Sequence, residues 1–159
     1  MKKIAIICLL LCLSLSLCGC DPTWYTYGDF SLTDITRIEL VYYHFEDAVV
    51  YNYIGRSTEK ILPFEFEKME VLETLPDESV GDFLEELAPL RVWSGYHANS
   101  PSGFSLRLTY GDGSFLLVSI LGSFVCHYDA TGEIRRVIGE PVSSYGYYKI
   151  IREYFNIKI

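Results

Sequence analysis

The chain of 159 residues is long enough for one domain with its own hydrophobic core, which needs no disulfide or metal for support. It contains 21 Asp and Glu against 13 Lys and Arg, a net charge of −8 at pH 7. Such an acidic surface repels the phosphate backbone, so nucleic acid is disfavoured as a partner. It also repels an anionic bilayer, so surface charge alone does not bring the chain to a membrane.

The N-terminus has the pattern of a signal peptide. Lys2 and Lys3 form a short positive region, and an apolar run follows at residues 4–17. As a helix this run would be about 21 Å long, against about 30 Å for the hydrocarbon core of a bilayer. It is too short to span comfortably and has the length of the apolar region of a secretory signal.

The residues that end this run resemble the lipobox of bacterial lipoproteins: Leu17-Cys18-Gly19-Cys20. The resemblance implies recognition of Leu17, Cys18 and Gly19. It also implies that a diacylglyceryl group joins the Cys20 sulfur and that cleavage occurs between Gly19 and Cys20. The alternatives are a plain cleaved signal peptide and an uncleaved anchor that happens to end in Cys. With two or three acyl chains, the protein would be held almost permanently to the cell membrane, facing outside the cytoplasm.

Lipidation divides the chain into a signal peptide at residues 1–19, a tether at 20–30 and one domain at 31–159. Loss of Lys2 and Lys3 leaves a mature charge of 11 − 21 = −10. The tether contains Trp24, Tyr25 and Tyr27, unlike an ordinary polar linker. These rings are therefore expected to pack on the domain or to lie among lipid headgroups.

The cysteines limit the chemistry of the mature chain. Cys8, Cys12 and Cys18 lie in the signal peptide, and lipidation makes Cys20 a thioether. Cys126 would then be the only free thiol. An internal disulfide and a Cys-rich zinc site are therefore excluded from the mature domain.

The first half of the domain reads as strands followed by a helix. Alternating apolar residues predict a strand at 35–45, and 48–54 is expected to return beside it as a hairpin. Residues 64–75 are ambiguous, and a strand with one bulge is preferred to a helix. Pro76-Asp77-Glu78 begins a helix that Pro89 ends, with one apolar stripe formed by Val80, Phe83, Leu84 and Leu87.

The second half begins with a loop at residues 91–103 and continues as a meander. Strands are predicted at 104–110, 114–121, 124–128 and 133–138, with a tight turn at Gly111-Asp112-Gly113. The near-continuous apolar run of the second of these strands predicts burial on both faces. A last helix is capped by Ser143 or Ser144, and its stripe is Tyr147, Ile150, Ile151 and Tyr154.

Together these elements predict an α+β fold. It has two layers, a mainly antiparallel sheet of about six to seven strands and two helices. The run Ser100-Pro101-Ser102-Gly103, the two turns ending at Gly113 and Gly132, and the closing Tyr154-Phe155 resemble small lipoproteins of Gram-positive gut bacteria. That group has no assigned activity, so the resemblance implies no functional residue beyond Cys20.

No pattern of residues predicts catalysis, a cofactor or a metal site. The three histidines, His44, His97 and His127, have no second ligand at metal-binding spacing. Cys126 and His127 are neighbours on a strand, so they face opposite sides and form no dyad. Cys126 shares the parity of apolar neighbours and is expected to be a buried small hydrophobe.

Aromatic residues give the strongest remaining signal. Trp93, Tyr96, His97 and Asn99 lie in one loop with Ser100, a composition suited to gripping a sugar or a peptide. The alternative is that these rings only cap the core. The preferred hypothesis is a non-catalytic, lipid-anchored module that binds an envelope protein or polymer through this loop. One alternative is an envelope-polymer hydrolase that uses two or more carboxylates converging beside Trp93. Another is an immunity-type lipoprotein that neutralises a toxin.

Overall fold

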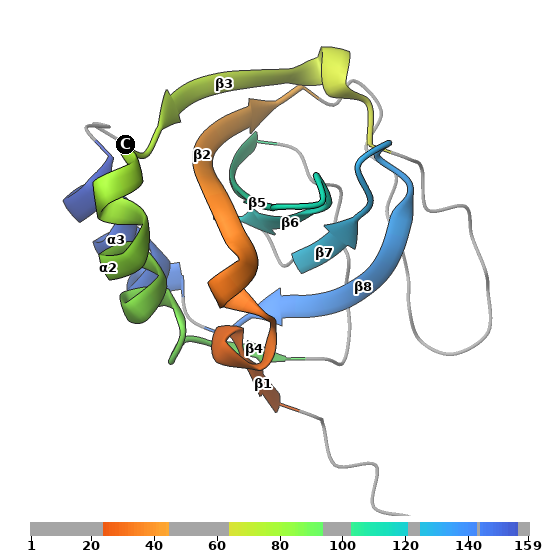
Figure 1. Cartoon of the computed structure of the whole chain (residues 1–159). Helices are drawn as coiled ribbons and strands as arrows, with labels where there is room; N and C mark the ends of the chain where they lie inside the picture. Colours follow the sequence, from red (N-terminus) through yellow and green to blue (C-terminus); the bar gives the residue numbers. More distant parts are fainter. Residues whose placement is uncertain (1–23, 45–63, 94–102, 121–124, 143, 156–159) are drawn as a thin grey trace, which may run out of the picture.

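The computed structural model describes residues 24–44, 64–93, 103–120, 125–142 and 144–155. The described part contains eight strands, two α-helices and three short 3₁₀ helices (Figure 1). In chain order they are β1 (Trp24–Thr26), η1 (Tyr27–Asp29), η2 (Leu32–Asp34), β2 (Ile35–Tyr43), η3 (Phe66–Lys68), β3 (Met69–Thr74), α2 (Asp77–Leu87), β4 (Arg91–Trp93), β5 (Gly103–Tyr110), β6 (Phe115–Ser119), β7 (Val125–Tyr128), β8 (Ile134–Pro141) and α3 (Ser144–Tyr154).

The strands form one sheet in the order β1-β4-β8-β7-β6-β5-β2-β3, and every neighbouring pair is antiparallel. Figure 1 shows that β2 and β8 bend strongly, that α2 and α3 lie together on one side, and that β1 and β3 lie at opposite ends of the molecule. The α+β prediction is therefore confirmed, with the meander at β5–β8 and both helices in their predicted places.

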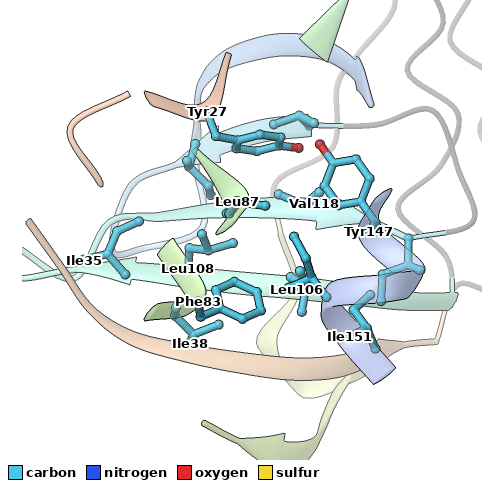
Figure 2. Packing of buried hydrophobic residues seen from close by; sticks show 14 of the residues in the cluster. Tyr27, Ile35, Ile38, Phe83, Leu87, Leu106, Leu108, Val118, Tyr147 and Ile151 are labelled. Carbon is cyan, nitrogen blue, oxygen red and sulfur yellow. The ribbon is translucent and has the colours of Figure 1, made fainter. Parts of the chain in front are cut away.

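The main core lies between the sheet and the two helices. Each helix buries the apolar stripe that its sequence predicts, with Phe83 and Leu87 on α2 and Ile150 and Ile151 on α3. Tyr27 joins this core: its ring meets that of Tyr147 edge to face at 5.7 Å, and the two hydroxyls point toward each other (Figure 2). Burial raises the pKa of both phenols, so both stay protonated.

A second, smaller core lies on the other face of the bent sheet. β6 is buried along its whole length because its alternate side chains serve the two cores. Leu116 and Val118 face the main core, whereas Phe115 and Leu117 face the smaller one. The predicted burial of this strand on both faces is confirmed. Phe64, Tyr128 and Cys126 also belong to the smaller core.

Several predictions about the strands differ from the structure. Residues 48–54, which were predicted to pair with β2, lie outside the described residues. The two strands that pair with β2 are β5 and β3. Residues 64–75 form a 3₁₀ turn before β3, so the strand is shorter than predicted.

β1 and β4 were not predicted as strands. Each has three residues, too few for a period-2 pattern, and each is formed by pairing with distant segments. Tyr27 directly after β1 is fully buried in the main core, and Tyr25 packs against that core, so these two rings of the expected tether pack on the domain. None of the helices in the described ranges is long and apolar enough to cross a membrane.

Gly132 closes the turn between β7 and β8 in a backbone conformation with φ of +90°. A Cβ added there would lie 2.5 Å from the Phe64 carbonyl oxygen, and the Phe64 N–H donates to the Gly132 carbonyl at 2.7 Å. We therefore expect Gly132→Ala to lower the free energy of unfolding by about 3 kcal/mol.

The matched control is Gly81→Ala in α2, where the added methyl meets nothing within 4 Å. It should raise that free energy by about 0.5–1 kcal/mol because alanine favours helix. Urea unfolding of both variants tests the pair, and equal shifts would contradict the role given to Gly132.

Candidate functional site

A cleft of about 800 Å³ opens between the 3₁₀ turns that follow β1 and the turn that joins β5 to β6. Its volume is in the range of small-molecule sites. The lining combines carboxylates, hydroxyls, two aromatic rings, a histidine and an arginine: Asp29, Phe30, Ser31, Thr33, Asp34, Thr36, Tyr110, Gly111, Asp112, Ser114, His127 and Arg135.

The turn from Tyr110 to Ser114 forms one wall. The Gly113 N–H donates to the Tyr110 carbonyl at 2.9 Å, and Gly113 has φ of +83°, which confirms the predicted glycine turn. Oδ1 of Asp112 accepts from the Ser114 N–H at 2.9 Å and from the Ser114 hydroxyl at 2.6 Å. These hydrogen bonds, first that from the hydroxyl, lower the pKa of Asp112, so its carboxylate is fixed in place and ionised at neutral pH.

The opposite wall is formed by η1 and η2. Oδ2 of Asp29 accepts from the Thr26 N–H at 2.6 Å and from the Thr26 hydroxyl at 3.1 Å, so this carboxylate holds the first turn. The two walls are joined because the Gly111 N–H donates to the Asp34 carbonyl at 3.0 Å. The Asp34 side chain is exposed, and no hydrogen bond or ion pair to its carboxylate is found in the part of the chain that the structure describes.

β7 and β8 supply the basic groups of the cleft. His127 lies on the face of β7 opposite to Cys126, as its parity predicts, and its ring centroid is 5.4 Å from that of Tyr110. Burial and, next, the positive charge of Arg135 lower the pKa of His127, although Asp112 opposes them. Because the unperturbed pKa is 6.5, the imidazole is neutral at pH 7. Nη1 of Arg135 lies 3.5 Å from Oδ2 of Asp112.

Tyr110 adds a protonated hydroxyl to the cleft. Burial, and after it the negative charges of Asp34 and Asp112, together raise its pKa to about 12. The phenol therefore remains a hydrogen-bond donor at any physiological pH. With the Phe30 ring in the same lining, the cleft offers aromatic surface beside its carboxylates.

Ser114, His127 and Asp112 do not have the polarity of a catalytic triad. The Ser114 hydroxyl donates to Asp112, so at 3.3 Å the His127 Nε2 can only donate to the Ser114 oxygen and does not take its proton. Ser114 is also only 2% exposed. The arrangement therefore orders the wall of the cleft, and the groups that reach a ligand are those of Asp34, Tyr110 and Arg135.

The structure describes one of the four residues that were predicted to bind a ligand. Trp93 lies in β4, half-buried, with its ring 6.3 Å from that of Trp24, and it does not line the cleft. Tyr96, His97 and Asn99 lie outside the described residues, as do the predicted cleavage and lipidation positions Gly19 and Cys20.

Two other residues considered in the sequence, Cys126 and His44, lie outside the cleft. Cys126 is fully buried, and burial raises its pKa to about 12, so it is the small hydrophobe that was expected. His44 is exposed, with Nε2 3.6 Å from a carboxylate oxygen of Glu70.

Sequence reasoning did not find the cleft. Its carboxylates come from segments far apart in the sequence, Asp29 and Asp34 on one side and Asp112 on the other, and no spacing rule joins such positions. The Gly111-Asp112-Gly113 turn was the one local signal, and it predicted a turn rather than a site.

Among the residues that the structure describes, no three His, Cys, Asp or Glu side chains lie close enough to hold a metal ion. Comparison of the chain with protein-family models, with curated proteins and with solved structures gave no significant match. The assignment of a function therefore depends on the chemistry of the cleft and on the N-terminal sequence.

Proposed function

We propose that this protein is a lipid-anchored, extracytoplasmic binding domain whose cleft takes a small ligand with a positively charged amine. The anchor is the diacylglyceryl group that the lipobox places on Cys20. The observation that supports a cationic ligand is that Asp29, Asp34 and Asp112 all line one cleft.

The charge of the cleft favours a cation. The lining contains three carboxylates and one guanidinium, that of Arg135. The lowered pKa of His127 keeps its imidazole from adding a second positive charge at pH 7. Asp29 and Asp112 are held by hydrogen bonds from their own turns, so the Asp34 carboxylate is the group that a ligand amine can pair with. The rings of Phe30 and Tyr110 add cation–π attraction and apolar contact.

Titration with simple amines tests this proposal. The probes are lysine, arginine, spermidine and glucosamine, added to isotope-labelled protein while backbone amide signals are recorded. We expect shifts confined to the cleft, at Thr36, Tyr110 and His127. Asp34→Asn should weaken binding about tenfold or more, because a hydrogen bond to a charged group contributes about 1.5–3 kcal/mol.

The matched control is Glu85→Gln, which removes the same charge from an exposed position of α2 that does not line the cleft. It should leave the affinity nearly unchanged because exposed charges at a distance are screened by salt. The proposal fails if no amine shifts the cleft signals, or if both variants weaken binding equally, which would indicate attraction by net charge alone.

Convergent carboxylates are also the feature expected of the alternative, an envelope-polymer hydrolase. That hypothesis placed the carboxylates beside Trp93, which does not line this cleft. It also needs a carboxyl group that is protonated at neutral pH, whereas hydrogen bonds lower the pKa of Asp112. Binding is therefore the better supported function. Release of soluble sugar from purified cell-wall polymer by the wild-type protein, lost in Asp34→Asn, would favour the hydrolase.

A further inference from the structure

The edge of the sheet nearest the N-terminus presents both tryptophans of the chain on one face. Trp24 in β1 is directly opposite Trp93 in β4, and the ring centroids are 6.3 Å apart with an angle of 31° between the planes. Trp24 is 52% exposed, the most exposed of the large apolar side chains that the structure describes. Such a pair at a sheet edge is costly in water and needs an explanation.

Other residues extend this face. Arg91 shares the face of Trp93 by strand parity, lies opposite Thr26 and is exposed. Val142, whose N–H donates to the Arg91 carbonyl at 2.9 Å, is 44% exposed. We call Trp24, Trp93, Arg91 and Val142 the tryptophan face. It combines indole rings, an aliphatic side chain and a guanidinium, the composition favoured at a membrane–water interface.

The face is held rigidly in the fold. Nη2 of Arg136 donates to the Tyr25 hydroxyl at 3.2 Å, and its guanidinium carbon lies 5.3 Å from the centre of the Tyr25 ring. Directly after β1, the Tyr27 N–H donates to the Leu90 carbonyl at 3.1 Å. β1 is therefore fixed on β4 and β8, and the two indoles form a preformed surface.

The length of the tether determines what this face meets. Only residues 20–23 precede Trp24 after cleavage at Cys20, and four residues span at most about 14 Å even when fully extended. With the acylated sulfur at the boundary of the hydrocarbon, so short a tether would keep Trp24 close to the lipid headgroups. This edge is less acidic than the mature chain as a whole, whose net charge is −10. β1, β4 and β8 contain three arginines and one acidic residue, Glu140, which is opposite Trp93 in the register.

We propose that the tryptophan face lies among the lipid headgroups of the membrane to which Cys20 is anchored, with both indoles at the interface. This inference rests on the lipid anchor of the proposed function and not on the ligand of the cleft. It fixes the orientation of the domain, since one particular edge of the sheet meets the bilayer. Asp29, three residues beyond β1, lines the cleft, so the cleft is held near the membrane surface.

Intrinsic fluorescence tests the inference directly, because the chain has only these two tryptophans. The full lipidated protein is reconstituted into phosphatidylethanolamine–phosphatidylglycerol vesicles, with and without bromine atoms on the upper part of the acyl chains. Trp24→Phe and Trp93→Phe report each indole separately. We expect brominated lipid to quench roughly half or more of the emission in the wild type and in both variants, with a shift to shorter wavelength.

The control places a tryptophan at the other end of the molecule. Leu72→Trp, made in the chain that lacks Trp24 and Trp93, puts an indole on β3, where Leu72 is 39% exposed. Its emission should be the same in brominated and ordinary vesicles. Quenching there equal to that at Trp24 would show that the domain has no fixed orientation and would overturn the inference.

Flotation and mass measurement separate the two ways in which the experiment can fail. Protein that carries the acyl mass and floats with vesicles, but whose tryptophans are not quenched, overturns the tryptophan face and leaves the anchor in place. Protein that carries no acyl mass overturns the anchor, and the inference fails with it.

Discussion

Replacing Glu39 by alanine is expected to lower the free energy of unfolding by about 3–5 kcal/mol, because it leaves a buried guanidinium without its partner. Glu39 in β2 is fully buried and lies directly opposite Arg107 in β5. Nε of Arg107 donates to Glu39 Oε2 at 2.6 Å, and Nη2 of Arg107 pairs with the same oxygen. Arg37 reaches the other oxygen at 2.7 Å from a more exposed position.

The environment of Arg107 explains the size of this effect. Its side chain is 14% exposed, its Nη1 contacts the Met69 sulfur at 3.6 Å, and its guanidinium carbon lies 6.0 Å from the centre of the Phe115 ring. None of these neighbours replaces a carboxylate. Without Glu39, the charge stays in a largely apolar site and loses its strongest hydrogen bonds.

Two controls separate loss of the pair from loss of packing. Glu39→Met combined with Arg107→Met replaces the pair by apolar side chains and should be much closer to the wild type than Glu39→Ala. Glu70→Ala removes a carboxylate whose pair with His44 is exposed on both sides, and it should change stability little. Urea unfolding of the domain gives all three values. A double variant as unstable as Glu39→Ala would show that the pair itself, rather than the unpaired charge, accounts for the stability.

Cys20→Ser is expected to abolish acylation completely, since the attached group requires a sulfur nucleophile at that position. Cells grown with a clickable palmitate analogue should label the wild-type protein and not the variant. The wild-type protein should bind membranes far more strongly than Cys20→Ser, because each buried CH₂ contributes about 0.8 kcal/mol and a diacylglyceryl group has two full chains.

Two further variants make the same chemical change elsewhere in the chain. Cys18→Ser alters a recognition position at which the lipobox tolerates small residues, so labelling should persist. Cys126→Ser alters a thiol that is fully buried in the smaller core and therefore not accessible for acylation, so labelling should again persist. Label that disappears with Cys18 or Cys126, or a mature protein that still begins at Met1, would contradict lipidation at Cys20.

Local sequence patterns were sufficient for most of the secondary structure. The stripes ending at Leu87 and Tyr154 predicted α2 and α3 because residues at i, i+3, i+4 and i+7 share one side of a helix. Period-2 alternation and glycine turns predicted the meander, and the apolar run in β6 predicted burial on both faces. The lipobox and the pattern before it, which also need no tertiary information, predicted the anchor.

Only the tertiary structure decided which distant segments meet. β1 and β4 are too short to show a period, and their pairing alone brings Trp24 beside Trp93. The cleft exists because β2 pairs with β5, with Ile35 opposite Tyr110, which sets η2 beside the turn at Asp112. Periodicity reports which side of its own element a residue faces, whereas a site assembled across strands depends on long-range register. That register is fixed by the packing of two cores, which no local pattern encodes.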